Sequence, residues 1–348
     1  MDGLHIGTSA DNFFQTDHDL AVQRRRAAKQ NNKAGDPIVC TSKVLCMLLP
    51  DEPDYVYFGE SGFVAKKKNL LSGKTVKTFS GHNGPVTRLA LWRKDGTGEC
   101  LITFTSHTDF VKSLAISNTR SKLYSGSSDK DIRSWDLITG EPLQVFKGHT
   151  RGIEDLAFDE GENFLYSASS DRLVMKWDPL TAKCLQVFEG HLTSIYALQI
   201  FDDEMWTASA DTTVKRWDLI TGKPDTTFEH SDFVKCIAFF GSFVITGSRD
   251  ETIRVFDIGS GELINEVEGH FDEVSCMVVR GSTLYSGSLD CTIRKWSLVD
   301  IVSPTKDKGA ESREKTESEP VPQKEVPGVT LTEEEERELA ELLESDDD

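Results

Sequence analysis

The sequence predicts an all-β fold in which small four-stranded sheets are stacked radially around one axis. A histidine recurs along the chain, separated by 25, 42, 42, 39 and 40 residues, at His82, His107, His149, His191, His230 and His270. Each of the last five histidines is followed by a small-residue strand, an aspartate and an aromatic residue. A period near forty residues indicates a fold that is built from one repeated supersecondary unit.

The second marker is preserved in five segments. They read YSGSSDKDIRSWD (residues 124–136), YSASSDRLVMKWD (166–178), WTASADTTVKRWD (206–218), ITGSRDETIRVFD (245–257) and YSGSLDCTIRKWS (285–297). In the unit that begins at His149, the runs IEDLAF, FLYSAS, LVMKW and LQVFEG have the character of strands and are separated by turn residues. A four-stranded sheet of this size cannot bury both of its faces alone, so the sheets are expected to pack against one another.

Together the two markers resemble those of the WD-repeat family over roughly residues 38–300. The resemblance implies a β-propeller in which a His, a Ser or Thr, an Asp and a Trp form a hydrogen-bonded chain within each blade. Matching by position implies four complete chains: His107–Ser125–Asp129–Trp135, His149–Ser167–Asp171–Trp177, His191–Thr207–Asp211–Trp217 and His270–Ser286–Asp290–Trp296. The unit of His230 offers Thr246 and Asp250, but Phe256 replaces the Trp and has no N–H to donate, which predicts a shorter chain.

These His/Ser/Asp sets have the composition of catalytic triads, but their repetition argues for a structural role. Five copies of one constellation are typical of a scaffold, whereas an active site is normally single. The sequence also has no phosphate-cradling glycine loop and no clustered metal ligands. We therefore predict a protein that is not an enzyme and that has no cofactor, metal site or small-molecule substrate.

The first two units depart from the pattern. Residues 43–79 contain four strand-like runs, but Gly62 and Lys68 stand where the Asp and Trp are expected, so this blade is predicted to depend on packing alone. Only 25 residues separate His82 from His107, which leaves no room for two middle strands. Counting this short unit predicts seven blades with a truncated second blade, and six blades is the alternative.

The predicted propeller spans residues 36–302. Its last unit lacks an outer strand, and the family resemblance implies that an N-terminal strand closes the ring. Pro37-Ile38-Val39-Cys40 is the candidate strand, and Ile301 with Val302 is the alternative.

The two ends of the chain are predicted to lie outside the propeller. Residues 1–35 form a flexible leader, in which Arg24-Arg25-Arg26 is either a nuclear localisation signal or part of a solvated segment. Residues 303–348 form a flexible, disordered acidic tail with a short helix at about 332–344, begun by a capping box from Thr332 to Glu335. Its apolar face, which either docks on a partner or belongs to a tail that binds nothing, consists of Leu339, Leu342 and Leu343.

Composition narrows the classes of partner. The 348 residues carry a formal charge of -19, which repels phosphate backbones. We therefore do not expect direct binding of nucleic acid. The seven cysteines are scattered and form no C-x-x-C pair, as expected for reduced thiols and not for a zinc site. No apolar run is long enough to span a bilayer. We predict a cytoplasmic or nuclear protein without a membrane segment.

Propellers that resemble this one bind partners through the loops after each repeated histidine and before each tetrad aspartate. The aromatic and arginine side chains in these loops are the types enriched in binding hot spots. The candidate partner-binding residues on this face are Phe110, Arg151, Phe233, Arg249 and Phe271. A group of lysines at positions 66, 67, 68, 74 and 77 is a further basic patch, interpreted either as a contact for acidic partners or as a solvated outer strand.

The predicted function is that of a non-catalytic, protein-binding scaffold or adaptor within a multi-protein complex. One alternative is a substrate-recognition subunit of a ubiquitin ligase. The W-D-x-R pattern of one such class is absent, since Trp135-Asp136 is followed by Leu137-Ile138, and the leader is short for an F-box. Another alternative is a factor in ribosome or ribonucleoprotein assembly.

Overall fold

The computed structural model describes residues 32–92 and 102–303. The predicted tail helix, with Leu339, Leu342 and Leu343, lies outside the described residues, as do nearly all of the leader and the acidic tail. No helix within the described ranges is both long enough and apolar enough to cross a membrane.

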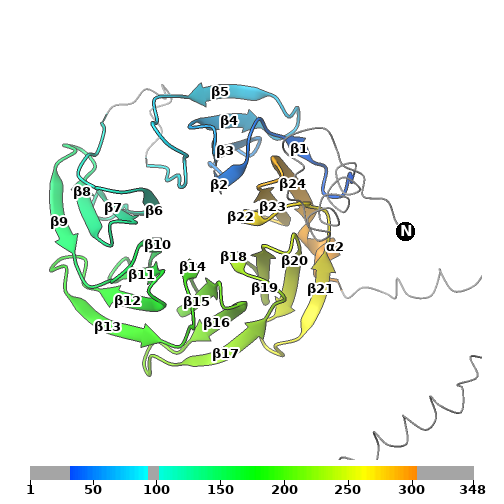
Figure 1. The fold of residues 1–348 in the computed structure, drawn as a ribbon. Coiled ribbons are helices and arrows are strands. Elements are labelled where there is room, and N and C mark those ends of the chain that lie inside the picture. The colour runs from blue at the N-terminus through cyan, green and yellow to red at the C-terminus, as the bar shows by residue number, and fades with distance from the viewer. Residues whose placement is uncertain (1–31, 93–101, 304–348) are drawn as a thin grey trace, which may run out of the picture. The chain divides into compact units, whose positions relative to one another are not determined.

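Six antiparallel four-stranded sheets surround a central axis as the blades of a propeller (Figure 1). Blade 1 contains β2 (Val44–Leu48), β3 (Tyr55–Glu60), β4 (Ala65–Asn69) and β5 (Thr75–Phe79). Blade 2 contains β6 (Val111–Ser117), β7 (Lys122–Ser127), β8 (Ile132–Asp136) and β9 (Pro142–Phe146). Blade 3 contains β10 (Ile153–Phe158), β11 (Leu165–Ser169), β12 (Leu173–Trp177) and β13 (Cys184–Glu189).

The second half of the ring follows the same order. Blade 4 contains β14 (Ile195–Phe201), β15 (Glu204–Ser209), β16 (Thr213–Trp217) and β17 (Pro224–Glu229). Blade 5 contains β18 (Val234–Phe240), β19 (Phe243–Ser248), β20 (Ile253–Asp257) and β21 (Leu263–Val267). Blade 6 contains β22 (Val274–Arg280), β23 (Thr283–Ser288), β24 (Thr292–Ser297) and β1 (Ile38–Val39), and the short helix α2 (Leu298–Ile301) follows it.

The hydrophobic core lies between neighbouring blades. The cluster between blades 3 and 4, for example, contains Tyr166, Phe188 and Trp217, and the rings of Phe188 and Trp217 meet edge-on at 6.0 Å. Close approach depends on small residues in the second strands. A Cβ added to Gly287 would lie 2.8 Å from the Cys276 sulfur and 2.8 Å from Val44 of the next blade. The small residues that mark each repeat in the sequence thus allow the blades to pack tightly.

The ring is closed by a strand from the N-terminal side of the propeller. Strand β1 pairs antiparallel with β24, with Ile38 opposite Ile293 and Val39 opposite Thr292. This confirms the predicted role of residues 37–40. Ile301, the alternative, ends helix α2 and is buried in the core cluster of blades 5 and 6.

The predicted seventh, truncated blade is wrong, and the described structure has the six blades of the alternative. Residues 80–92 and 102–110 lie between β5 and β6 and contain no strand in the described ranges (Figure 1). The physical reason lies in the short spacing between His82 and His107. A strand-like run such as residues 86–92 forms a strand only where a neighbour supplies hydrogen bonds, and the described residues of this segment supply no middle strands.

The strandless segment instead fills space with its side chains. Val86 is buried beside Cys46 and Ala65 of blade 1, and its N–H donates to the Glu60 carbonyl. On the other side, Trp92 and Phe104 pack on the cluster of Leu123, Trp135 and Leu137 in blade 2. Both flanking blades are therefore covered by parts of one incomplete unit.

A partly buried ion pair connects this segment to blade 3, beyond its neighbour blade 2. The Arg88 guanidinium donates to Oδ1 of Asp155, the third residue of β10. Asp155 is only 4% exposed and also accepts backbone N–H bonds from Leu156 and, in β14, from Leu198, each at 3.0 Å. One carboxylate thus joins the irregular unit to blades 3 and 4.

Replacing Arg88 with Met is expected to lower the free energy of unfolding by about 2 kcal/mol or more, because it leaves a buried carboxylate without its cation. The measurement is chemical denaturation of the Arg88→Met variant. Arg216→Met is the matched control, since Arg216 pairs with the more exposed Glu204 and Asp225 and should change stability by about 1 kcal/mol or less. If both variants lose the same free energy of unfolding, the ion pair between Arg88 and Asp155 does not contribute more than an ordinary surface pair.

Candidate functional site

Polar chains span four of the six blades. In blade 3, His149 Nδ1 lies 2.9 Å from Asp171 Oδ2 and its Nε2 lies 2.7 Å from Ser167 Oγ, while Trp177 Nε1–H donates to the same hydroxyl at 2.8 Å. The structure brings the other three sets together with spacings of 2.7–2.8 Å: His107–Ser125–Asp129–Trp135, His191–Thr207–Asp211–Trp217 and His270–Ser286–Asp290–Trp296.

Each chain holds two loops together at one end of its blade. Asp171 Oδ2 accepts the backbone N–H of Thr150 at 2.8 Å, so the carboxylate bridges the loop before β10 and the turn after β11. Burial opposes ionisation, but hydrogen bonds from His149 and from backbone amides lower the pKa of Asp171 to about 2. The aspartate therefore stays ionised and keeps both loops in place at neutral pH.

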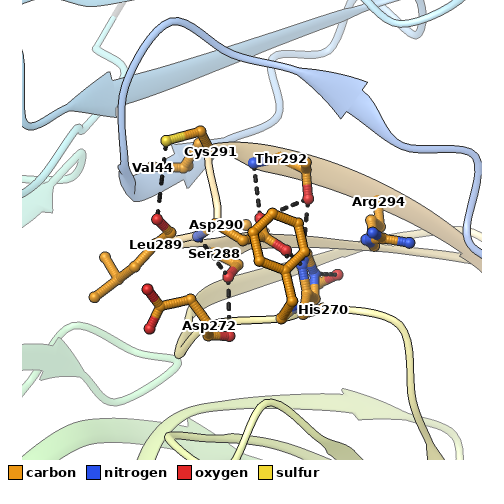
Figure 2. A network of polar contacts seen from close by, with 12 residues as sticks. Val44, His270, Asp272, Ser288, Leu289, Asp290, Cys291, Thr292 and Arg294 are labelled. Carbon is orange, nitrogen blue, oxygen red and sulfur yellow. Dashed lines mark hydrogen bonds and ion pairs between the residues drawn. The ribbon is translucent and has the colours of Figure 1, made fainter. Parts of the chain in front are cut away.

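Figure 2 shows the corresponding arrangement in blade 6. Asp290 Oδ1 accepts the Thr292 hydroxyl at 2.6 Å, and the Asp290 N–H donates to Ser288 Oγ at 3.0 Å. Ser288 in turn donates to the carbonyl of Asp272, which is in the loop after His270. The loop after the histidine is therefore fastened at two points.

Blade 5 departs from this pattern. His230 Nε2 lies 2.8 Å from Thr246 Oγ1, but its buried Nδ1 has no hydrogen-bond partner in the described structure. Asp250 instead pairs with Arg254 at 2.8 Å and accepts the Ser231 hydroxyl. The phenyl ring of Phe256 fills the place of the missing indole, 5.3 Å from the His230 ring. The link between histidine and aspartate is therefore broken in this blade.

Blade 1 does not depend on packing alone, which corrects the expectation for this unit. The buried Lys66 Nζ lies 2.7 Å from Glu60 Oε2, and both side chains bond to Thr41. Lys68 donates to the Val39 carbonyl in β1. An ion pair replaces the His–Asp chain here, and sequence matching missed it because neither Glu60 nor Lys66 occupies a tetrad position.

The same contacts remove most of the predicted basic patch. Lys66 and Lys68 are buried, and Lys67 bonds to Glu52 at 2.6 Å and lies 4.3 Å above the Tyr55 ring. These lysines therefore stabilise blade 1 and are not free to meet an acidic partner.

The candidate partner-binding residues lie in the loops that follow the repeated histidines and in the turns before the tetrad aspartates. Phe110 precedes β6 and is 62% exposed. Phe233 precedes β18, and the guanidinium of the exposed Arg249 lies 4.9 Å above its ring and 3.7 Å from Asp232. Phe271 is half-buried. The structure thus places an exposed aromatic on blade 2 and an aromatic–arginine pair on blade 5.

Arg151 borders a polar hollow of about 350 Å³ on the same face, between blades 3 and 4. The hollow is lined by Thr150, Arg151, Ser170, Asp171, Arg172, Leu192, Thr193 and Ser194. Arg151 is among the residues predicted from the sequence, whereas Arg172 is not. The sequence signal for Arg172 is its place directly after a tetrad aspartate.

A second cavity of about 390 Å³ lies along the inner strands and includes Arg88, Asp155 and Lys235. Its charges are largely paired. Arg88 pairs with Asp155, and Lys235 lies 3.5 Å from Glu273 and 3.6 Å above the Tyr196 ring. Within the described residues, no group of three His, Cys, Asp or Glu side chains is arranged to hold a metal ion.

Comparison with known proteins identifies the repeats. The family model described as WD domain, G-beta repeat matches residues 98–136, 140–178, 182–218, 222–257 and 261–297. An uncharacterized WD repeat-containing protein of Schizosaccharomyces pombe is 31% identical over 299 residues, which cover 74% of this chain and 81% of the relative. The nuclear distribution protein PAC1 of Zygosaccharomyces rouxii is 40% identical over 58 residues, 16% of this chain and 13% of the relative.

Replacing Trp177 with Phe is expected to cost about 1–3 kcal/mol, because Ser167 loses a buried hydrogen bond. Trp206→Phe is the matched control. Trp206 is equally buried, but its indole N–H has no partner among the described residues, so the same change removes no hydrogen bond. Thermal or chemical unfolding measures both variants. If Trp177→Phe costs no more than Trp206→Phe, the hydrogen-bonded chain does not stabilise blade 3.

The burial of His230 predicts a loss of stability in mild acid. Desolvation and the nearby Arg254 lower the pKa of His230 from 6.5 to about 4. Between these values the unfolded chain binds more protons than the folded chain, so the free energy of unfolding falls as pH decreases from 6.5 to 4, by roughly 2–3 kcal/mol.

His230→Gln removes this titration and should flatten the dependence of unfolding free energy on pH in that window. The measurement is a series of denaturant titrations between pH 4 and pH 7. An unchanged slope in the variant would assign the acid sensitivity to other groups.

Proposed function

Because this chain belongs to the WD40 repeat family, we propose that it is a non-catalytic adaptor that binds other proteins through the loop face of its propeller. The described structure presents a rigid framework and, on one face, side chains suited to protein contacts. The partners are proposed to be subunits of a multi-protein complex.

The observation that carries this proposal is the exposure of Phe110 and of Arg249, whose guanidinium covers the half-buried Phe233 ring, on loops that hydrogen bonds hold in place. Exposed aromatic and arginine side chains are the types that dominate binding energy in protein interfaces. Loops that are already ordered lose little conformational entropy on binding, which favours affinity. The polar chains supply that order in blade 2 through His107 and Asp129.

The charge of the chain supports proteins as partners. At a formal charge of -19, long-range repulsion disfavours nucleic acids and anionic membrane surfaces. We place this function in the cytoplasm or nucleus. The six described cysteines are free thiols, and Cys40, Cys46, Cys236 and Cys276 are buried as small apolar side chains, which suits a reducing compartment.

A double variant, Phe110→Ala with Arg249→Ala, is expected to reduce the recovery of specific partners at least tenfold in quantitative affinity purification of the full chain. Truncating hot-spot residues typically costs about 2 kcal/mol or more each in binding free energy. The matched control is Ile138→Ala with Leu180→Ala. These side chains are 63% and 60% exposed in the turns β8–β9 and β12–β13, at the opposite end of the blades.

Unfolding curves of both double variants should match that of the unchanged protein, since all four side chains are exposed or lie in loops. Partner recovery that survives the loop-face changes would contradict the proposal. So would an equal loss in the control variant, because binding would then not depend on this face.

A further inference from the structure

Two arginines line the hollow between blades 3 and 4. Arg151 is in the loop between β9 and β10, and Arg172 is in the turn between β11 and β12. Both are exposed, and within the described ranges neither makes an ion pair or a side-chain hydrogen bond. Two cationic side chains without an ion-pair partner among the described residues therefore border one hollow in a strongly acidic chain.

The carboxylates closest in sequence are already engaged. Asp171 is held by His149 and by the Thr150 amide. Glu154 bonds to Lys112 and to the Ser170 hydroxyl, each at 2.6 Å. Neither acid forms an ion pair with the guanidinium groups. The ionised Asp171 is the one acid among the residues that line the hollow, so the two arginines leave an excess of positive charge there.

The equivalent positions of the other blades show that the fold does not require two basic residues here. The two positions carry Asp109 and Lys130 in blade 2, Thr193 and Thr212 in blade 4, Asp232 and Glu251 in blade 5, and Asp272 and Cys291 in blade 6. Blade 3 is the one described blade in which both are basic. The backbone is the same throughout, since Arg172 has a φ of 79° and its four equivalents have φ values of 65–77°.

Two threonines, Thr150 and Thr193, also line the hollow. Among the described residues, neither hydroxyl makes a hydrogen bond, and the same is true of the Thr193 backbone N–H. Each guanidinium adds five N–H donors in a planar fork. This number exceeds what the two oxygens of one carboxylate accept, whereas a phosphate monoester offers three oxygens and nearly two negative charges.

We propose that this hollow binds a phosphorylated serine or threonine side chain of a partner protein. Arg151 and Arg172 clamp the phosphate from two sides, and the threonine hydroxyls bind its remaining oxygens. At about 350 Å³ the hollow is larger than a phosphate group, so it also accommodates neighbouring peptide residues. Leu192, which is 76% exposed at its rim, offers an apolar contact to one of them. This inference rests on the proposed function and adds the chemical class of the partner.

The test is binding of the full chain to a degenerate peptide array with phosphothreonine or phosphoserine fixed at the centre. Parallel arrays carry the unphosphorylated residue or glutamate at that position. We expect at least tenfold stronger binding to phosphorylated peptides, lost in Arg151→Gln/Arg172→Gln. The Arg151→Lys/Arg172→Lys variant keeps the charge but loses the planar fork, and should bind several-fold more weakly than the unchanged protein.

The matched control is Lys147→Gln/Lys183→Gln, which removes the same charge from exposed sites outside the hollow and should retain phosphopeptide binding. Equal binding to phosphorylated and unphosphorylated arrays would overturn the inference, as would phosphate-selective binding that survives the Arg→Gln changes. Glutamate peptides that bind as well as phosphopeptides would overturn the assignment to phosphate. If partner recovery in affinity purification depends on Phe110 and Arg249 while the arrays fail, only this inference falls.

Discussion

The hydrogen-bonded chain from histidine through hydroxyl to indole is the constraint on which the structure depends. It connects the second and third strands of a blade to the loop before the first strand, and the aspartate joins that loop to the turn after the second strand. In blade 3 the carboxylate of Asp171 bonds to both His149 and the Thr150 amide. Such a buried network stabilises a blade only when every donor and acceptor is satisfied. Its position explains why one end of the propeller has fixed loops that are available for binding.

Blades 1 and 5 lack the complete chain, yet polar contacts between other residues hold them together. The fold therefore requires a buried polar network in a blade, but not one particular set of residues. In blade 5, Asp250 forms an ion pair with Arg254 and makes no bond to His230. Arg254 also pairs with Glu266. In blade 1, Lys66 and Glu60 form a buried pair beside Thr41. Removing charges from water is costly, so each pair persists only with additional hydrogen bonds around it. In both blades that lack the tetrad indole, an ion pair with its own hydrogen bonds therefore replaces the bond between histidine and aspartate.

The sequence allowed the repeated part of the fold to be predicted because each polar chain is local to one repeat. His149, Ser167, Asp171 and Trp177 lie within one unit, so their order and spacing are visible in the sequence. The ion pair between Arg88 and Asp155 could not be predicted in this way. Its members are 67 residues apart and belong to different units, one of them without strands. The number of blades was mispredicted for the same reason, since hydrogen-bond partners, and not a histidine, decide whether a run such as residues 86–92 becomes a strand.

The turn after each tetrad aspartate separates what the fold requires from what it leaves free. Its residue adopts a left-handed backbone in blades 2 to 6, although none of these residues is glycine. The backbone conformation is the same in these blades, while the side chain differs from blade to blade. A left-handed non-glycine residue carries a conformational cost whatever its side chain, so the backbone of this turn does not explain why blade 3 has an arginine there. The presence of both Arg151 and Arg172 at one hollow is therefore better explained by binding of a ligand there than by the folding of the blade.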